Sequence, residues 1–159
     1  MTRRFSALAL VVGGIVFPAS IAAAQPGDPA IGTWTLNVAK STFNPGPAPK
    51  SLIVRFDAAG NGIHVVADAV ALSGAAVRSE YTCSYDGADC PLTGVTGADV
   101  VALRRIDART TERIDKKAGR VVQTYRRKVS ADGKTMTVTE KGRSSDGKAV
   151  ANTLVLERT

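Results

Sequence analysis

The stretch "AIGTWTLN", residues 30–37, follows a long alanine-rich leader and contains the only tryptophan of the chain. Trp34 stands two places after Gly32, and the residues that follow alternate between polar and apolar. Alternation with a period of two is typical of a β-strand that has one buried face. We therefore expect the first strand of the fold over residues 31–38.

Residues 1–24 have the features of a secretory signal peptide. A basic start is followed by an uncharged apolar run over residues 7–17, which Pro18 ends. Three alanines at 22–24 match the small-x-small pattern of a signal peptidase site, so we expect cleavage before Gln25. The apolar run is too short to span a bilayer of about 30 Å, so we expect no stable membrane insertion after cleavage. The leader is bacterial in type and predicts a periplasmic or extracellular protein.

Cleavage would leave residues 25–159, which is the length of a single domain. The formal charge falls from +7 to +5, because the leader carries two basic residues and no acidic one. A basic chain suggests nucleic acid as a partner. Here, however, Lys and Arg are spread along the predicted strands and interleaved with Asp and Glu. This distribution favours a solvated surface of mixed charge, and we expect no nucleic-acid partner.

Turn signals recur about every dozen residues along the rest of the chain and separate segments rich in Val, Thr, Ile, Leu and Tyr. No segment has a helical period of sufficient length, so the pattern predicts an all-β sandwich or barrel. Sequential hairpins form an antiparallel up-and-down meander. A long meander closes into a barrel of about 8–10 strands, because closure removes exposed edges. We expect strands at 31–38, 50–58, 62–70, 76–85, 88–92, 98–107, 110–117, 120–130, 134–141 and 149–158, with 76–92 as one interrupted hairpin.

Alternation within three of these strands identifies their apolar faces. The segments are "SLIVRFDA" (51–58), "KTMTVTEKG" (134–142) and "ANTLVLERT" (151–159). One wet face and one buried face are typical of antiparallel strands, so we expect the apolar residues to line the interior. The predicted ligand-contacting residues of these strands, together with the tryptophan, are Trp34, Leu52, Val54, Phe56, Met136, Val138, Leu154 and Leu156.

A second candidate site lies on the strand 120–130, where Gln123, Tyr125 and Arg127 share one face. If that face points inward, Tyr125 and Arg127 could bind a carboxylate or another anion, since Arg presents a planar fork of donors. If it points outward, the three residues form an ordinary solvated stripe. We favour the outward orientation, because charged strand faces usually meet water.

Cys83 and Cys90 bracket "SYDGAD" and are the only cysteines of the chain. If Asp86 and Gly87 are the centre of a type I′ turn, which this dipeptide favours, the two cysteines face each other across a hairpin. Directly opposed strand residues lie about 4.5–5.5 Å apart, within the Cα range of a disulfide. In an oxidising compartment we therefore predict a Cys83–Cys90 disulfide.

No catalytic or metal-binding motif is evident. The only histidine, His64, lies on the strand face opposite Ile63 and Val65, and it has no second histidine or unpaired cysteine with which to bind a metal. Paired carboxylates, phosphate-binding loops and Ser-centred nucleophile motifs are absent from the sequence. We therefore expect no enzymatic activity, no cofactor and no metal, and a surface position for His64.

The segment "AKSTFNPGPAPKS", residues 39–51, separates the first two strands. Its three prolines within five residues exclude a helix there. Long loops without secondary structure are often functional, so this one is either a lid over one end of the barrel or a plain connector.

A Gly-x-Trp at the start of the first strand of an up-and-down barrel resembles the lipocalin and fatty-acid-binding-protein superfamily, the calycins. In that superfamily the tryptophan plugs the closed end, and a basic side chain near the last strand lies across it. The resemblance implies that Arg158 packs on Trp34 through a cation–π contact. The segment from Asp115 to Arg158 also resembles a fatty-acid-binding protein in its rhythm of strands, glycine turns and a final "ER". Residues 32–51 are similar to a group of uncharacterised exported bacterial proteins.

The chain departs from fatty-acid-binding proteins at two places. The prolines of residues 39–51 exclude the helix pair that caps those barrels. Leu154 and Leu156 stand where an Arg-x-Tyr would hold the fatty-acid carboxylate.

Together these features predict an exported lipocalin-like barrel that binds a small apolar or amphipathic molecule in its interior. The alternative is a filled barrel that acts through its surface, as a protein-interaction module or a periplasmic protease inhibitor. Small exported bacterial inhibitors of metalloproteases are similar in their signal peptide, Gly-x-Trp barrel and short disulfide. They insert an N-terminal segment into the protease, and "QPGDPAI" (25–31) would be that segment here. The volume of the cavity distinguishes the two functions, and the sequence identifies no particular protein partner.

Overall fold

The computed structural model describes residues 27–144 and 146–159. The predicted signal peptide and its cleavage site lie outside these residues. Within the described part of the chain, no helix is long and apolar enough to cross a membrane.

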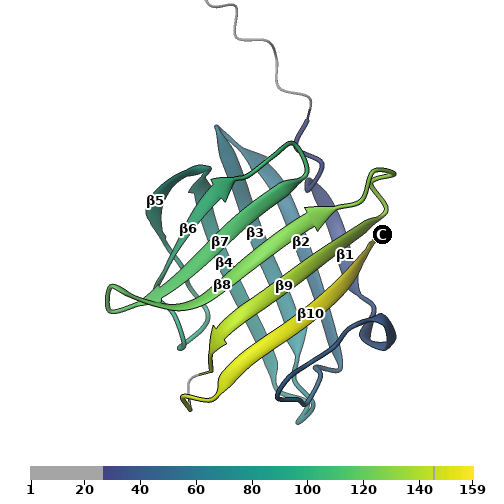
Figure 1. Cartoon of the computed structure of the whole chain (residues 1–159), viewed down its shortest axis with the longest axis vertical. Helices are drawn as coiled ribbons and strands as arrows, with labels where there is room; N and C mark the ends of the chain where they lie inside the picture. The colour runs from purple at the N-terminus through teal and green to yellow at the C-terminus, as the bar shows by residue number, and fades with distance from the viewer. Residues whose placement is uncertain (1–26, 145) are drawn as a thin grey trace, which may run out of the picture.

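Ten antiparallel strands form one sheet that curls into a nearly closed barrel (Figure 1). Along the sheet the strands follow the order β4-β3-β2-β1-β10-β9-β8-β7-β6-β5, so β1 pairs with β10, and β4 and β5 are the two edges. This arrangement confirms the predicted up-and-down barrel, and each of the ten predicted segments overlaps one strand, although β2, β5 and β9 extend one or two residues beyond the predicted bounds. The elements are β1 (Gly32–Leu36), η1 (a 3-10 turn, Val38–Lys40), β2 (Ser51–Ala59), β3 (Gly62–Val70), β4 (Ala76–Ser84), β5 (Asp86–Pro91), β6 (Val100–Arg105), β7 (Thr110–Lys117), β8 (Arg120–Val129), β9 (Thr135–Arg143) and β10 (Ala149–Arg158).

The pairing register shows which side chains share the barrel interior. Trp34 is directly opposite Val54 on one side and Arg158 on the other, and Leu156 is opposite Met136. Directly opposed residues point to the same face of a sheet. The predicted apolar faces do point inward. Most of them lie in the buried core, with Leu52 and Leu154 half-buried against it, and the fully packed members are Trp34, Val54, Phe56, Met136, Val138 and Leu156.

Trp34 closes the end of the barrel at which β1 begins. Its side chain is completely buried, and its indole N–H donates a hydrogen bond of 2.8 Å to the carbonyl of Ala30. The guanidinium of Arg158 lies 4.2 Å from the centre of the ring. This contact is the cation–π pair that the calycin resemblance implied.

Arg158 also ties three separate segments together at this end. Its guanidinium donates to the carbonyls of Pro29, Ile31 and Gly133 at 2.6–2.7 Å. The chain at Gly32 passes so close to it that a Cβ there would lie 2.6 Å from Nη1 of Arg158. Gly32 also has a φ of +127°, which disfavours any residue with a side chain. The glycine of the Gly-x-Trp motif therefore makes room for the arginine that covers the tryptophan.

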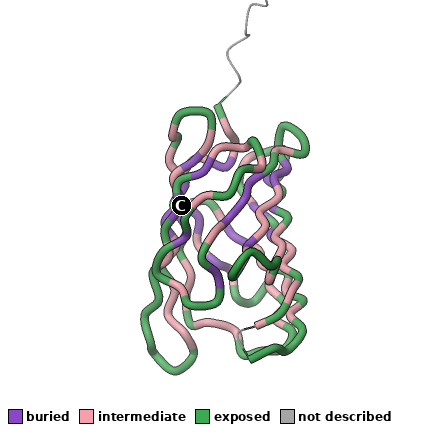
Figure 2. Tube along the Cα trace, turned by 90° about the vertical axis from the view of Figure 1, so that its left-hand side faces the viewer, coloured by how far each residue is buried: buried purple, intermediate pink, exposed green. Residues whose placement is uncertain are grey.

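The two halves of the barrel differ in how far their residues are buried. We call the half that contains Trp34 the closed half and the other the open half. Figure 2 shows most of the buried stretches toward the top of the view, with half-buried and exposed stretches dominating below. The strand register places the β1–β2, β3–β4, β5–β6, β7–β8 and β9–β10 connections around the open half.

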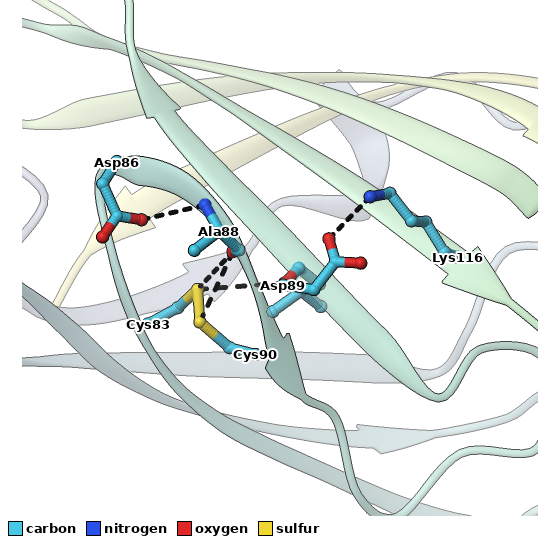
Figure 3. The surroundings of a disulfide bond; sticks show 7 residues. Cys83, Asp86, Ala88, Asp89, Cys90 and Lys116 are labelled. Carbon is cyan, nitrogen blue, oxygen red and sulfur yellow. Dashed lines mark hydrogen bonds and ion pairs between the residues drawn. A yellow bond between two sulfur atoms is a disulfide. The ribbon is translucent and has the colours of Figure 1, made fainter. Parts of the chain in front are cut away.

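Cys83 of β4 and Cys90 of β5 form a disulfide, with their Cα atoms 5.6 Å apart (Figure 3). The predicted pairing is confirmed, but the predicted type I′ turn is wrong. Gly87 has a positive φ and Asp86 does not, and the Asp86 carboxylate instead accepts a hydrogen bond from the Ala88 N–H at 2.9 Å. Nor do β4 and β5 form a ladder, because each pairs with its other neighbour. The disulfide therefore links the two edges of the sheet rather than the two arms of a hairpin.

The proline-rich loop runs beside β10. The backbones of Thr42 and Thr153 exchange two hydrogen bonds of 2.8 Å, and the Ala151 N–H donates to the carbonyl of Asn44 at the same distance. The first part of the loop thus continues the pairing of β1 with β10 beyond η1. This arrangement supports the connector interpretation.

Candidate functional site

A cluster of polar side chains lies inside the barrel on β7 and β8. Arg113 is directly opposite Tyr125, and Asp115 is directly opposite Gln123. Their shared face points inward, because Asp115 is 2% exposed and Arg127, two places beyond Tyr125, is 6% exposed. The outward orientation that we favoured for Gln123, Tyr125 and Arg127 is therefore wrong. Each of these polar groups finds hydrogen-bonding or aromatic partners inside the barrel, which reduces the penalty of burial.

Arg113 and Asp115 form a buried bidentate ion pair. Nε and Nη2 of the arginine lie 2.5 and 2.7 Å from the two carboxylate oxygens. The guanidinium also lies over the rings of Tyr81 and Tyr125, 4.8 and 4.9 Å from their centres. Burial alone would lower the pKa of Arg113, but Tyr81 and the Asp115 carboxylate raise it above its ordinary value. Arg113 therefore keeps its positive charge inside the barrel.

A chain of hydrogen bonds continues from β8 to β9 and β10. The Tyr125 hydroxyl donates to Gln123 Oε1 at 2.8 Å, and Gln123 Nε2 donates to Glu140 Oε1 at 2.7 Å. Asn152 Nδ2 donates to the other Glu140 oxygen at 2.9 Å. Burial raises the pKa of the Tyr125 phenol, and the nearby Glu140 carboxylate raises it further. Tyr125 therefore keeps its proton and acts as a hydrogen-bond donor.

Arg127 differs from Arg113 because no carboxylate of the described residues forms an ion pair with it. Its Nη2 donates to the Tyr81 hydroxyl at 2.6 Å, and its guanidinium lies 5.3 Å from the centre of the Phe56 ring. A charge removed from water without a counter-ion is costly. An anion inside the barrel would lower that cost, and Arg127 offers it a planar set of donors.

A pocket of about 660 Å³ lies in the open half and reaches the polar cluster at Gln123. Its volume falls within the range of small-molecule sites. The loop 39–51 contributes nothing to its walls. These walls come from β4, the β5–β6 connection, the facing ends of β7 and β8, and the end of β9, through Val77, Gly94, Val95, Thr96, Gly97, Lys117, Val122, Gln123, Arg143 and Ser144.

The structure separates the sequence-predicted ligand residues into two groups. Trp34 and the other packed apolar residues belong to the closed half and are sealed in the core. Leu52, Leu154 and Tyr125 are half-buried, and none of these predicted residues lines the pocket. Gln123, named beside Tyr125 in the sequence pattern, does line it.

The sequence pattern missed four interior polar residues: Tyr81, Arg113, Asp115 and Glu140. One signal was available for two of them. In "TERIDKK" (111–117), Arg113 and Asp115 alternate with the same period as Gln123, Tyr125 and Arg127 on the next predicted strand. Opposite charges at i and i+2 share one strand face and can pair there.

His64 lies on the outer face of the barrel, as expected. Its Nε2 is 2.9 Å from Glu80 Oε1, and its Nδ1 is 3.8 Å from Asp57 Oδ2. The three side chains are on neighbouring strands, because His64 opposes Asp57 and is beside Glu80 across β3 and β4. Within the described residues, no group of three or more potential metal ligands is assembled here or elsewhere.

The first described residues are bound to the closed end of the barrel. The Asp28 carboxylate accepts hydrogen bonds from the Tyr85 hydroxyl at 2.5 Å and from Arg105 Nη2 at 2.7 Å. Burial would raise the pKa of Asp28, but hydrogen bonds from Tyr85, the Ala30 N–H and Arg105 lower it below its ordinary value. From Asp28 onward, the segment that a protease inhibitor would insert into its target is instead held by its own barrel.

Neither a family model nor a curated protein matches the chain. Among solved structures, the zebrafish ileal bile acid-binding protein complexed with cholic acid is similar to it with a TM-score of 0.50 and 9% sequence identity. That match covers 82% of this chain and 99% of the other. The siderocalin Ex-FABP matches with a TM-score of 0.38 and 10% identity, covering 82% of this chain and 74% of the other. The chain therefore shares the barrel fold of the bile acid-binding protein, and this is the fold that its Gly-x-Trp motif implied.

Proposed function

We propose that this protein is an exported carrier that binds a small amphipathic molecule with an acidic group inside its barrel. The observation that carries the proposal is Arg127, a buried cation without an ion-pair partner among the described residues. Tyr81 holds its guanidinium in place, and the neighbouring Tyr125 keeps its proton as a donor. An acidic group beside Arg127 would accept hydrogen bonds from its guanidinium, and the Tyr125 hydroxyl could join them only by leaving Gln123.

The rest of the ligand would contact apolar surface. Leu52, Ala67 and Leu154 are only half-buried against the core, and their directly paired positions place them on the interior face. A ligand that covers them removes apolar area from water, which favours binding in proportion to that area. The ligand class is therefore a molecule with an apolar body and one acidic group.

Export is supported by two features of the chain. The leader has the organisation of a signal peptide, and the disulfide is a bond that persists in oxidising compartments. Cell fractionation of a bacterium that produces the full chain tests this part. Recovery of a shortened chain that begins at Gln25 in the periplasm or medium is the expected result, and a full-length cytoplasmic chain would contradict it.

Calorimetric titration with dodecanoate and with dodecanol tests the ligand class, because the two differ only in the acidic group. Charge-assisted hydrogen bonds contribute about 1.5–3 kcal/mol, so we expect the acid to bind about 10- to 150-fold more tightly. Arg127→Met should remove this preference. Arg126→Met, on the exposed face of the same strand, should keep it. Equal affinity for the acid and the alcohol in the unmodified protein would refute the proposed role of Arg127.

A further inference from the structure

The seam between β4 and the segment 86–97 is the one line along which the barrel wall lacks a strand ladder in the described residues. We propose that the ligand reaches the interior through this seam, and that the loop 93–97 is the movable wall of an access site for anionic amphiphiles. This inference rests on the proposed function and adds to it the route and the residues that control it.

The seam is fastened at two points. At the closed half, the disulfide joins Cys83 to Cys90. Farther along, the backbones of Glu80 and Thr93 exchange hydrogen bonds of 3.2 and 3.0 Å, and the Thr93 hydroxyl donates to the Glu80 carbonyl at 3.2 Å. Beyond Glu80, residues 76–79 of β4 pair with β3 alone. The open half of the seam is therefore held by the Glu80–Thr93 bridge.

The pocket of about 660 Å³ is located at this open half of the seam. Val77 of β4 faces it and is 41% exposed, which is high for a residue on an inward-facing position. Val95 and Val122 form further apolar wall and pack against the core behind it. Lys117 and Arg143 supply positive charge to the same walls. An apolar surface with cationic groups at its edge suits a molecule with an apolar body and one acidic group. This is the ligand class that Arg127 favours in the interior.

The loop 93–97 closes the seam by an unusually close approach. Gly94 has a φ of +85°, and a Cβ at this position would lie 1.8 Å from the carbonyl oxygen of Arg78 on β4. The loop can therefore rest against β4 only while residue 94 has no side chain. Gly97 ends the same short loop, and glycines of this kind allow the backbone changes that a moving wall requires.

Opening of the seam at the loop 93–97 requires little rearrangement of the barrel. The Glu80–Thr93 bridge must break, while the disulfide holds the other end of the seam and β5 remains paired with β6. Gln123 connects the pocket to Tyr125 through their hydrogen bond, so a ligand that passes the loop meets the interior cluster directly.

Stopped-flow binding of the anionic amphiphile anilinonaphthalene sulfonate to the full-length protein and to Gly94→Ala tests the route. The added methyl group prevents the loop from closing on β4, so association and dissociation should both accelerate about tenfold with little change in affinity. Gly119→Ala is the matched control. Its φ is also positive, at +75°, but a Cβ there meets nothing within 4 Å. This variant should bind and release the probe at the unmodified rates.

A second variant covers the case in which Gly94→Ala does not fold. Thr93→Val keeps the backbone bridge and removes the hydroxyl contact with Glu80, so both rates should rise about two- to threefold. Unchanged rates in the folded variants would overturn the proposed route while leaving the carrier function intact. Failure of the unmodified protein to bind the probe at all would overturn the carrier function and the route with it.

Discussion

Replacement of Arg158 by methionine tests whether the closed end of the barrel depends on the guanidinium that covers Trp34. The change retains an apolar stem and removes three hydrogen bonds to carbonyl groups together with the cation–π contact. Hydrogen bonds of this kind contribute about 0.5–1.5 kcal/mol each, and a cation–π pair at an accessible site about 0.5–1 kcal/mol. Arg158 is itself exposed, so water can replace part of what is lost. We therefore expect the free energy of unfolding to fall by about 2–4 kcal/mol.

Urea unfolding followed by the fluorescence of Trp34, the only tryptophan, provides the measurement. With a typical dependence on urea, the loss corresponds to a midpoint lowered by about 1–2 M. Arg126→Met is the matched control, because the Arg126 side chain is exposed and forms no hydrogen bond or ion pair with a described residue. Arg158→Lys should recover only a minor part of the loss, since an ammonium group cannot reach all three carbonyls. A loss below about 0.5 kcal/mol in Arg158→Met would refute the reasoning.

Gly32→Ala provides an independent test of the same contact. A methyl group at this position would lie 2.6 Å from the guanidinium, so part of its destabilising effect requires Arg158 to be present. In a double-mutant cycle, the combined variant should therefore lose less stability than the sum of the two single variants. Strict additivity would show that the glycine is needed only for its backbone conformation.

Three further predictions concern the interior, the seam and the N-terminal segment. The double change Arg127→Met with Tyr81→Phe should leave the free energy of unfolding unchanged or raise it, because a buried unpaired charge and the hydroxyl that binds it disappear together; a loss above about 2 kcal/mol in urea unfolding would contradict this. Cys83→Ala with Cys90→Ala should lower the free energy of unfolding by about 2–3 kcal/mol, as a short closed loop predicts. Reduction of the disulfide in the unmodified protein should lower the free energy of unfolding by the same amount. A clear difference between the two losses would show that the alanine substitutions also change the packing. The folded state lowers the pKa of Asp28. The stability that this carboxylate contributes is therefore fully present above the pKa that Asp28 has in the unfolded chain, and it is lost as the pH falls through the lower pKa of the folded protein. Between about pH 5 and pH 3, the Asp28→Asn variant should therefore lose less stability than the unmodified protein. If thermal unfolding shows equal losses for both proteins, Asp28 is not a source of the acid sensitivity.

The pattern of strands could be predicted because it is local. Alternation in segments such as 51–58 and 134–142 identifies each strand and the residues that share its faces, and turn residues mark its ends. The Gly32–Trp34 spacing indicated the closed end through its resemblance to calycin barrels. Both residues belong to one short segment, so the motif that carries the resemblance can be recognised in the sequence.

Only the tertiary structure decided which polar face is inside and where the barrel wall is weakest. A period of two places Tyr125 and Arg127 on one face, but it does not distinguish inside from outside. The Phe56 ring and the Tyr81 hydroxyl, which contact the Arg127 guanidinium, come from β2 and β4, many residues earlier in the chain. The cysteines illustrate the same limit, since the local argument found the bond but assigned it to a hairpin instead of the seam between the two sheet edges. A sequence pattern sets the order of side chains along each strand, whereas the closure of ten strands around a common interior determines which distant strands supply their partners.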